Sequence, residues 1–185
     1  SIRRLLHVQN SQRRASTLKQ RLQSPIRSKI RRRQDMDAIF FIAKPKIARQ
    51  IMPMLRYYYA QSIPCYSLSQ VYSGRVNPRQ DRDLNQVIFS TLPWLVDTQH
   101  ALPSNLLALH RALQATWPSL LKKTPELLAF GVDAYNLIGN LPKLLRFPTL
   151  GLKSATGTLF LTKQHLIIRQ PIWAIMRSGR PQRAN

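Results

Sequence analysis

The sequence predicts an α/β fold with a mostly parallel sheet, an antiparallel edge and a C-terminal β-hairpin. Short apolar runs that suit buried strands alternate with longer segments whose apolar residues recur at helical spacing. The 185 residues suffice for one ordinary globular domain, and 44% of them are hydrophobic, which disfavours a fully disordered chain. The single cysteine, Cys65, excludes an internal disulfide framework and any multi-cysteine metal site.

The first 34 residues stand apart by their charge. They carry 11 of the 29 Lys and Arg and no acidic residue, so residues 35–185 hold 18 basic against 7 acidic residues. Short apolar groups at helical spacing predict one or two basic amphipathic helices, ended by Ser24-Pro25. We therefore divide the chain into a basic helix and loop segment, 1–34, and a main domain, 35–185. An Arg-rich, acid-free opening is also typical of an organelle transit peptide.

Three strands are expected in the central part. The continuous apolar run 38–43 (AIFFIA) suits a strand covered on both faces. The segments 63–68 and 86–91 are the second and third strands. A helix of about 14 residues that begins at Pro45 separates the first two strands, and crossovers of this kind join parallel strands. The first two strands should therefore be parallel neighbours.

Two helices and a hairpin follow. One helix is expected from about 103 to 117, and another from 124 to 145, where Thr-Pro-Glu gives a good start signal. The segments 155–161 and 166–176 flank the polar stretch 162–165. This pattern predicts a β-hairpin.

No catalytic, cofactor or metal site is expected. The four histidines lie too far apart for a metal-binding motif, and phosphate-binding loops and hydrolase motifs are missing from the sequence. Two pairs of close carboxylates, Asp35 with Asp37 and Asp81 with Asp83, stand beside arginines and are expected to form local ion pairs. Cys65 lies in an apolar strand and should be a small buried residue. The chain is predicted not to be an enzyme, and an enzyme with an unrecognised site is a distant third hypothesis.

Nucleic-acid binding is the main alternative hypothesis. An Arg-rich, acid-free segment releases counterions from phosphates, and the run Arg56-Tyr57-Tyr58-Tyr59 offers rings for stacking. Successive tyrosines on one helix point in three directions, however. The competing interpretation is one buried ring and two at the edge.

A ligand crevice in an α/β sheet lies beyond the carboxyl ends of its strands. In this chain the expected position is near Ala43, Lys44, Ser69 and Tyr72. The alternative is that these residues only close loops.

Four groups of segments, taken in order, carry a family resemblance. They are RRRQDMD (31–37) before AIFFIA; VYSG (71–74) with DRDLN (81–85) and LPWL (92–95); GVDAYNL (131–137); and SATGTLFL (154–161) with PIWAIMRSGRP (171–181). Their order and spacing resemble the C-terminal part of the LppC/LpoA lipoproteins, outer-membrane proteins of Gram-negative bacteria. The resemblance covers nearly the whole chain. Gln86 and the turn 162–165 depart from the family pattern, because a glycine is expected in each.

The resemblance implies a type I periplasmic-binding-protein-like fold, in which several crossovers join two α/β lobes. The three central strands would belong to one lobe, the helix 124–145 to the other, and the hairpin would return to the first. Residues 35–185 would then be a partial domain with a mostly parallel sheet and flanking helices. The chain would be a fragment, because the lipidated cysteine, the helical N-terminal domain and about half of the binding-protein-like domain are absent.

The resemblance also implies a function. The family regulates a bifunctional class A penicillin-binding protein, the peptidoglycan synthase, which it binds and activates without being an enzyme. The full-length parent would act on the periplasmic side of the outer membrane, with no cofactor and no specific nucleic acid. Membrane contact would come only through a lipid anchor absent from this chain, since its longest apolar run, 38–43, is far shorter than the roughly 20 residues of a span.

Overall fold

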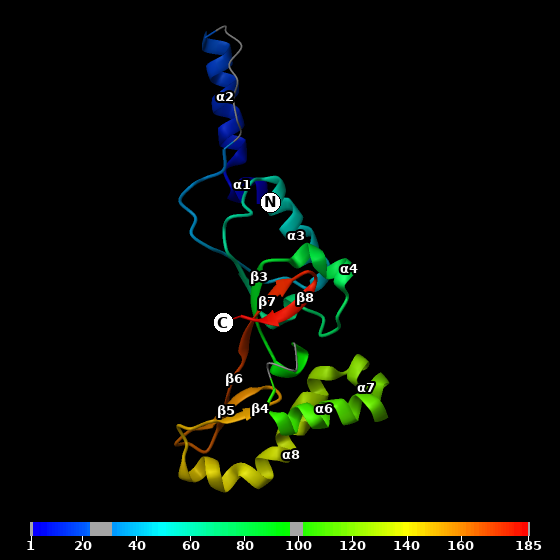
Figure 1. The fold of residues 1–185 in the computed structure, drawn as a ribbon. Coiled ribbons are helices and arrows are strands. Elements are labelled where there is room, and N and C mark those ends of the chain that lie inside the picture. Colours follow the sequence, from blue (N-terminus) through cyan, green and yellow to red (C-terminus); the bar gives the residue numbers. More distant parts are fainter. Residues whose placement is uncertain (1, 23–30, 97–101, 185) are drawn as a thin grey trace.

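Two β-sheets organise the chain, which the computed structural model describes over residues 2–22, 31–96 and 102–184 (Figure 1). The first sheet has the strand order β1-β2-β3-β7-β8, and the second has the order β4-β5-β6. The strands are β1 (Ile39–Phe41), β2 (Cys65–Ser67), β3 (Val87–Thr91), β4 (Leu152–Ser154), β5 (Gly157–Leu161), β6 (Ile167–Gln170), β7 (Ile172–Arg177) and β8 (Arg180–Arg183).

Helices flank both sheets. The α-helices are α1 (Ile2–Leu5), α2 (Val8–Leu22), α3 (Pro45–Tyr57), α4 (Pro78–Asp81), α6 (Ser104–Thr116), α7 (Pro118–Lys123) and α8 (Pro125–Arg146). Short 3-10 turns are η1 (Ser69–Val71), η2 (Arg82–Leu84) and η3 (Pro93–Leu95). In Figure 1, α3 and α4 lie beside the first sheet, α1 and α2 lie above it, and α6 to α8 accompany the second.

The first sheet confirms the predicted parallel order. Strands β1 and β2 are parallel neighbours, because α3 carries the chain back to the start of the sheet, and β3 is parallel to β2 after a connection through η1, α4 and η2. Helix α3 begins with Pro45 in its first turn and buries Ala48, Met52 and Leu55 at helical spacing. Strand β7 is antiparallel to β3, which gives the predicted antiparallel edge.

The core of the first sheet also includes the start of the chain. Leu6 and Val8 are almost fully buried, in the same cluster as Val87 and Phe89 of β3. The basic segment 1–34 is therefore tied to the sheet at one end, and its boundary at residue 34 stays a proposal. The stop signal at Ser24-Pro25 lies outside the described residues.

The expected hairpin is only partly correct. Strands β5 and β6 do pair antiparallel around the turn, but they belong to the second sheet. Pro171, which has no backbone N–H, stands between β6 and β7, and the chain crosses there into the first sheet. Residues 166–176 therefore form two strands that belong to different sheets. Only the second of them, β7, lies in the first sheet. The C-terminal hairpin is formed by β7 and β8.

Two further details differ from expectation. Strand β1 is an edge strand, and it is not covered on both faces: Phe40 and Ile42, which share one face, are each 60% exposed. Helix α7 was not expected as a separate element. It begins at Pro118, which follows the last turn of α6 and restricts the preceding Trp117.

Both departures from the family's glycine pattern fall on left-handed backbone. Gln86, just before β3, has φ of 75°, and His165, in the turn between β5 and β6, has φ of 61°. A side chain is strained in this region, whereas glycine adopts it freely. Gln86 also donates its N–H to the carbonyl of Met176, which fixes the position of this turn against β7.

Replacing Gln86 by glycine is expected to stabilise the protein by about 0.5 to 1 kcal/mol, because the strain exceeds the added entropy of the unfolded chain. Thermal and urea unfolding measure this. Gln61→Gly is the matched control, since Gln61 lies nearby at an ordinary negative φ, and it should lower stability. Equal losses in both variants would contradict the strain argument.

Candidate interaction surface

A buried carboxylate joins α8 to the second sheet. Asp133 is 3% exposed and accepts hydrogen bonds from the backbone N–H groups of Ala155 and Thr156 at 2.7 and 2.8 Å. The Thr156 hydroxyl donates a third hydrogen bond to the same carboxylate. These groups form the tight turn between β4 and β5, so one side chain satisfies donors that would otherwise be buried without partners.

The same turn supports a second apolar cluster. The N–H of Trp94 donates to the carbonyl of Ala155 at 3.1 Å, and both residues pack with Leu106 of α6 and Ala129 of α8. The ring of His110 lies edge-on against Trp94, with 4.6 Å between ring centroids. Burial there lowers the pKa of His110 and so favours the neutral imidazole.

Asp81 is the second buried carboxylate. It pairs with Arg49 of α3 at 2.7 Å, and it is nearly inaccessible to solvent. The expected local partners in the same loop, Arg79 and Arg82, are not the ones used, because Asp81 points inward from α4 toward the helix that covers the sheet. The other expected ion pair is confirmed: Asp35 binds Arg33 at 2.6 Å, which lowers the pKa of Asp35 to about 2.

The segments that carry the family resemblance touch one another. Asn85 of DRDLN accepts a hydrogen bond from Gly179 in the turn of the β7–β8 hairpin. Gly74 of VYSG has φ of 72°, and a side chain there would meet Leu95 of LPWL. Together with the Asp133 contacts, these interactions indicate that the segments that carry the resemblance stabilise the fold.

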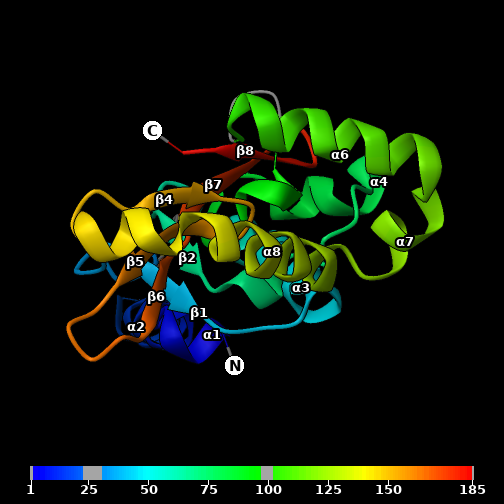
Figure 2. The ribbon, with the colours of Figure 1, turned by 90° about the horizontal axis from the view of Figure 1, so that it is seen from below.

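The outer face of α8 is an apolar stripe without a cover among the described residues. It consists of residues at helical spacing, Leu127, Phe130, Ile138, Leu141 and Leu145, which are between 41% and 77% exposed. Beside it, α6, α7 and α8 enclose an apolar groove of about 390 Å³ lined by Leu109, Leu113, Leu120, Leu127, Leu128 and Tyr135, among others. We call this area the α6–α8 apolar face. In Figure 1, α6, α7 and α8 lie at the opposite end of the molecule from α1 and α2, and Figure 2 views the molecule from below, onto α6, α7 and α8.

The four residues predicted for a ligand crevice do lie beyond the carboxyl ends of strands in the first sheet. Ala43 and Lys44 follow β1, and Ser69 and Tyr72 follow β2, so all four come after the carboxyl ends of parallel strands. Only Lys44 and Ser69 are exposed. The Tyr72 hydroxyl is buried with no partner in the described part of the chain, and burial raises its pKa. A crevice ligand stays a prediction.

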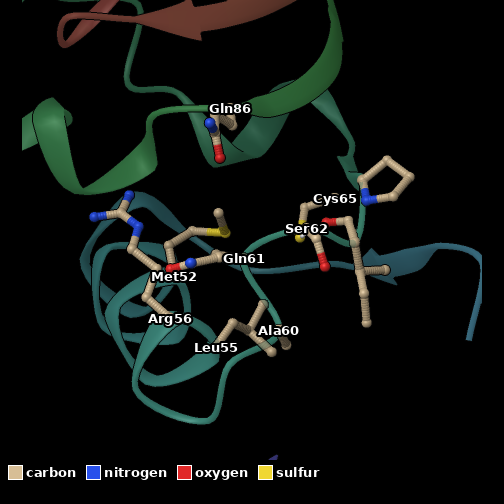
Figure 3. A pocket seen from close by; sticks show the side chains of 10 residues that line it. Met52, Leu55, Arg56, Ala60, Gln61, Ser62, Cys65 and Gln86 are labelled. Atoms are coloured by element: carbon tan, nitrogen blue, oxygen red, sulfur yellow. Dashed lines mark hydrogen bonds between the residues drawn. The ribbon is translucent and has the colours of Figure 1, made fainter. Parts of the chain in front are cut away.

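A hollow of about 340 Å³ opens at the opposite end of the strands, where β2 and β3 begin (Figure 3). It is lined by the end of α3 and by the residues that lead into β2 and β3, and the amide of Gln86 points into it from above Met52. Two of its polar groups already have partners within the protein. Arg56 donates to the carbonyl of Asp83, and Ser62 accepts from Arg32. Sequence reasoning missed this hollow, because its walls bring the stretch 52–65 together with Gln86, which lies in a separate segment.

Cys65 and the tyrosines 57–59 lie as the sequence predicts. Cys65 is buried as expected, and desolvation raises the pKa of its thiol. Tyr57 and Tyr59 are exposed while Tyr58 is partly buried, which matches the interpretation of one inner ring and two at the edge. Within residues 2–22, 31–96 and 102–184, no group of three potential metal ligands lies together, and no helix is long and apolar enough to cross a bilayer.

The sequence matches the family model for LppC lipoproteins over residues 1–179. The chain belongs to the LppC family. A relative from Vibrio vulnificus (strain YJ016), named penicillin-binding protein activator LpoA, is 26% identical over 169 residues, which cover 90% of this chain and 26% of the relative.

Solved structures agree on the fold. The LpoA (YraM) C-domain from Haemophilus influenzae, described as a regulator of PBP1A, aligns with a TM-score of 0.59 at 19% identity, over 92% of this chain and 49% of that chain. A protein described as a branched-chain amino acid ABC transporter from Rhodospirillum rubrum aligns with a TM-score of 0.50 at 15% identity, over 80% of this chain and 44% of that one. This LppC family member therefore has the periplasmic-binding-protein-like fold. It spans about a quarter of the length of the curated relatives it matches.

Replacing Asp133 by alanine in this LppC family member is expected to lower the free energy of unfolding by about 3 kcal/mol or more, because two buried N–H groups lose their acceptor. Thr156→Val removes one hydrogen bond and should cost about 1 kcal/mol. Glu126→Ala, on an exposed site of the same helix, is the control and should have little effect. Chemical denaturation gives the three values. Similar losses of stability for Asp133→Ala and Glu126→Ala would contradict the structural role of the Asp133 hydrogen bonds.

The α6–α8 apolar face is expected to make the isolated chain self-associate or bind a hydrophobic dye. Burying five such side chains is worth about 1.5 to 3 kcal/mol each, which is comparable to the net stability of a domain. Leu127→Gln with Ile138→Gln should weaken association in analytical ultracentrifugation without lowering the melting temperature, since both residues are exposed. Leu22→Gln on α2 is the control. A monodisperse, dye-negative monomer would refute this expectation.

Proposed function

We propose that this chain is part of a non-enzymatic activator of a class A penicillin-binding protein, the synthase that polymerises and crosslinks peptidoglycan. The observation that carries the proposal is the family match over residues 1–179. Relatives that bear the family's segments are named activators of penicillin-binding proteins, and one structural neighbour is described as a regulator of PBP1A. The full-length parent would act at the periplasmic side of the outer membrane.

The site chemistry supports regulation by contact. The two deeply buried carboxylates, Asp81 and Asp133, are both held by structural hydrogen bonds and so are not positioned as acids or bases. The accessible features are instead surfaces, namely the α6–α8 apolar face and a large excess of positive charge. Surfaces of this kind suit a protein partner, and charge complementarity would speed its association.

The direct test is a glycan-strand polymerisation and crosslinking assay with the cognate class A synthase. Addition of the full-length parent lipoprotein is expected to raise both rates, and this chain alone is expected to bind the synthase in a pull-down at low salt. The Asp133→Ala variant should lose binding together with its fold. No stimulation by the parent and no complex with this chain would sink the proposal.

A further inference from the structure

Helix α2 is a basic arm that leaves the body of the protein. Val8, its first residue, is buried in the core of the first sheet and anchors the helix. From there α2 extends away from the sheet, beyond α1, at the top of Figure 1. Its 15 residues correspond to a length of about 22 Å.

The cations of α2 lack acidic partners. Arg13, Arg14, Lys19 and Arg21 are all exposed, and residues 1–34 contain no Asp or Glu. The first acid along the sequence, Asp35, is held by Arg33. In the described part of the chain, ion pairs are formed by Arg33 and Arg49, and neither lies on α2. The positive charge of the helix is therefore available to an external anion.

The same helix presents exposed leucines. Leu18 and Leu22 are 51% and 61% exposed, and their spacing places them on the side of the helix that also holds Ala15. At 100° per residue, Arg14 and Arg21 flank the two leucines on one side, Lys19 flanks them on the other, and Arg13 lies opposite. A short helix with an apolar strip flanked by basic side chains, and with no acids, has the pattern of helices that lie in a membrane interface, where long basic side chains reach the lipid phosphates.

We propose that α2 docks this protein on an anionic bilayer surface, with Leu18 and Leu22 in the interface and the basic side chains on lipid phosphates. The leucines favour a bilayer over a nucleic acid, because phosphate recognition has no use for exposed aliphatic groups beside the cations. Two leucines bury little area, so the attachment is reversible and depends on salt. This docking is independent of the proposed contact with a synthase.

Co-sedimentation of the full chain with vesicles tests the proposal. Vesicles of equimolar phosphatidylglycerol and phosphatidylcholine should bind the chain, and pure phosphatidylcholine vesicles should not. Each basic residue near an anionic surface contributes about fivefold in affinity, so replacing four of them should weaken binding on the order of several hundredfold. The test variant is Arg13→Gln, Arg14→Gln, Lys19→Gln and Arg21→Gln.

A matched control removes the same charge elsewhere. The control variant is Lys122→Gln, Lys123→Gln, Lys143→Gln and Arg146→Gln, all exposed positions on α7 and α8. It should keep most of the binding, although its net charge equals that of the test variant. Equal loss in both variants would overturn the proposal in favour of a non-specific net-charge effect. Circular dichroism and thermal melts verify that both variants are folded.

The leucines give a second readout. Leu18→Ser with Leu22→Ser should weaken vesicle binding about tenfold or more, because the buried apolar area is lost while every charge remains. Binding to duplex DNA should be unaffected by the same change. Vesicle binding that is unchanged in the leucine variant would overturn the interfacial arrangement, and so would binding to duplex DNA that is tighter than binding to the anionic vesicles.

Discussion

The Asp133 carboxylate is the interaction on which the arrangement of the second sheet depends. That sheet has three short strands, and α8 turns most of its large apolar side chains outward, so few apolar contacts are available to join the two. The three hydrogen bonds from the β4–β5 turn reinforce the packing of Ala129 and Ala155 in one apolar cluster. Trp94 follows β3, and its backbone N–H donates to the same turn. The turn therefore also connects the second sheet to the first. The β4–β5 turn thus joins α8, through Asp133, to the segment after β3, through Trp94.

The two buried carboxylates add to the excess of positive charge at the surface. Asp81 and Asp133 are buried, whereas Asp35, Asp37, Asp83 and Glu126 are exposed. The imbalance of 29 basic against 7 acidic residues is therefore larger on the surface than in the sequence. For this reason contact with any partner is sensitive to salt.

Sequence reasoning reached the features that depend on local order. The parallel pairing of β1 and β2 followed from one crossover helix, and the start of α8 followed from its Thr-Pro-Glu signal. It could not pair Asp81 with Arg49, because 32 residues separate them and only the fold of α4 against α3 brings them together. It also missed the sheet change at Pro171, where one apolar pattern continues across two sheets. The hollow beside Gln86 was out of reach for the same reason.

The two edges of the first sheet are unequal in their capacity for further strand pairing. Strand β8 carries Pro181, which lacks an N–H, between arginines at 180 and 183, and charged or proline-containing edges resist addition of another strand. Strand β1 at the other edge shows the exposed Phe40 and has neither protection. If the sheet is ever lengthened, by a neighbouring polypeptide or by aggregation, growth starts at β1. An additional strand can therefore pair with β1, whereas β8 resists such pairing.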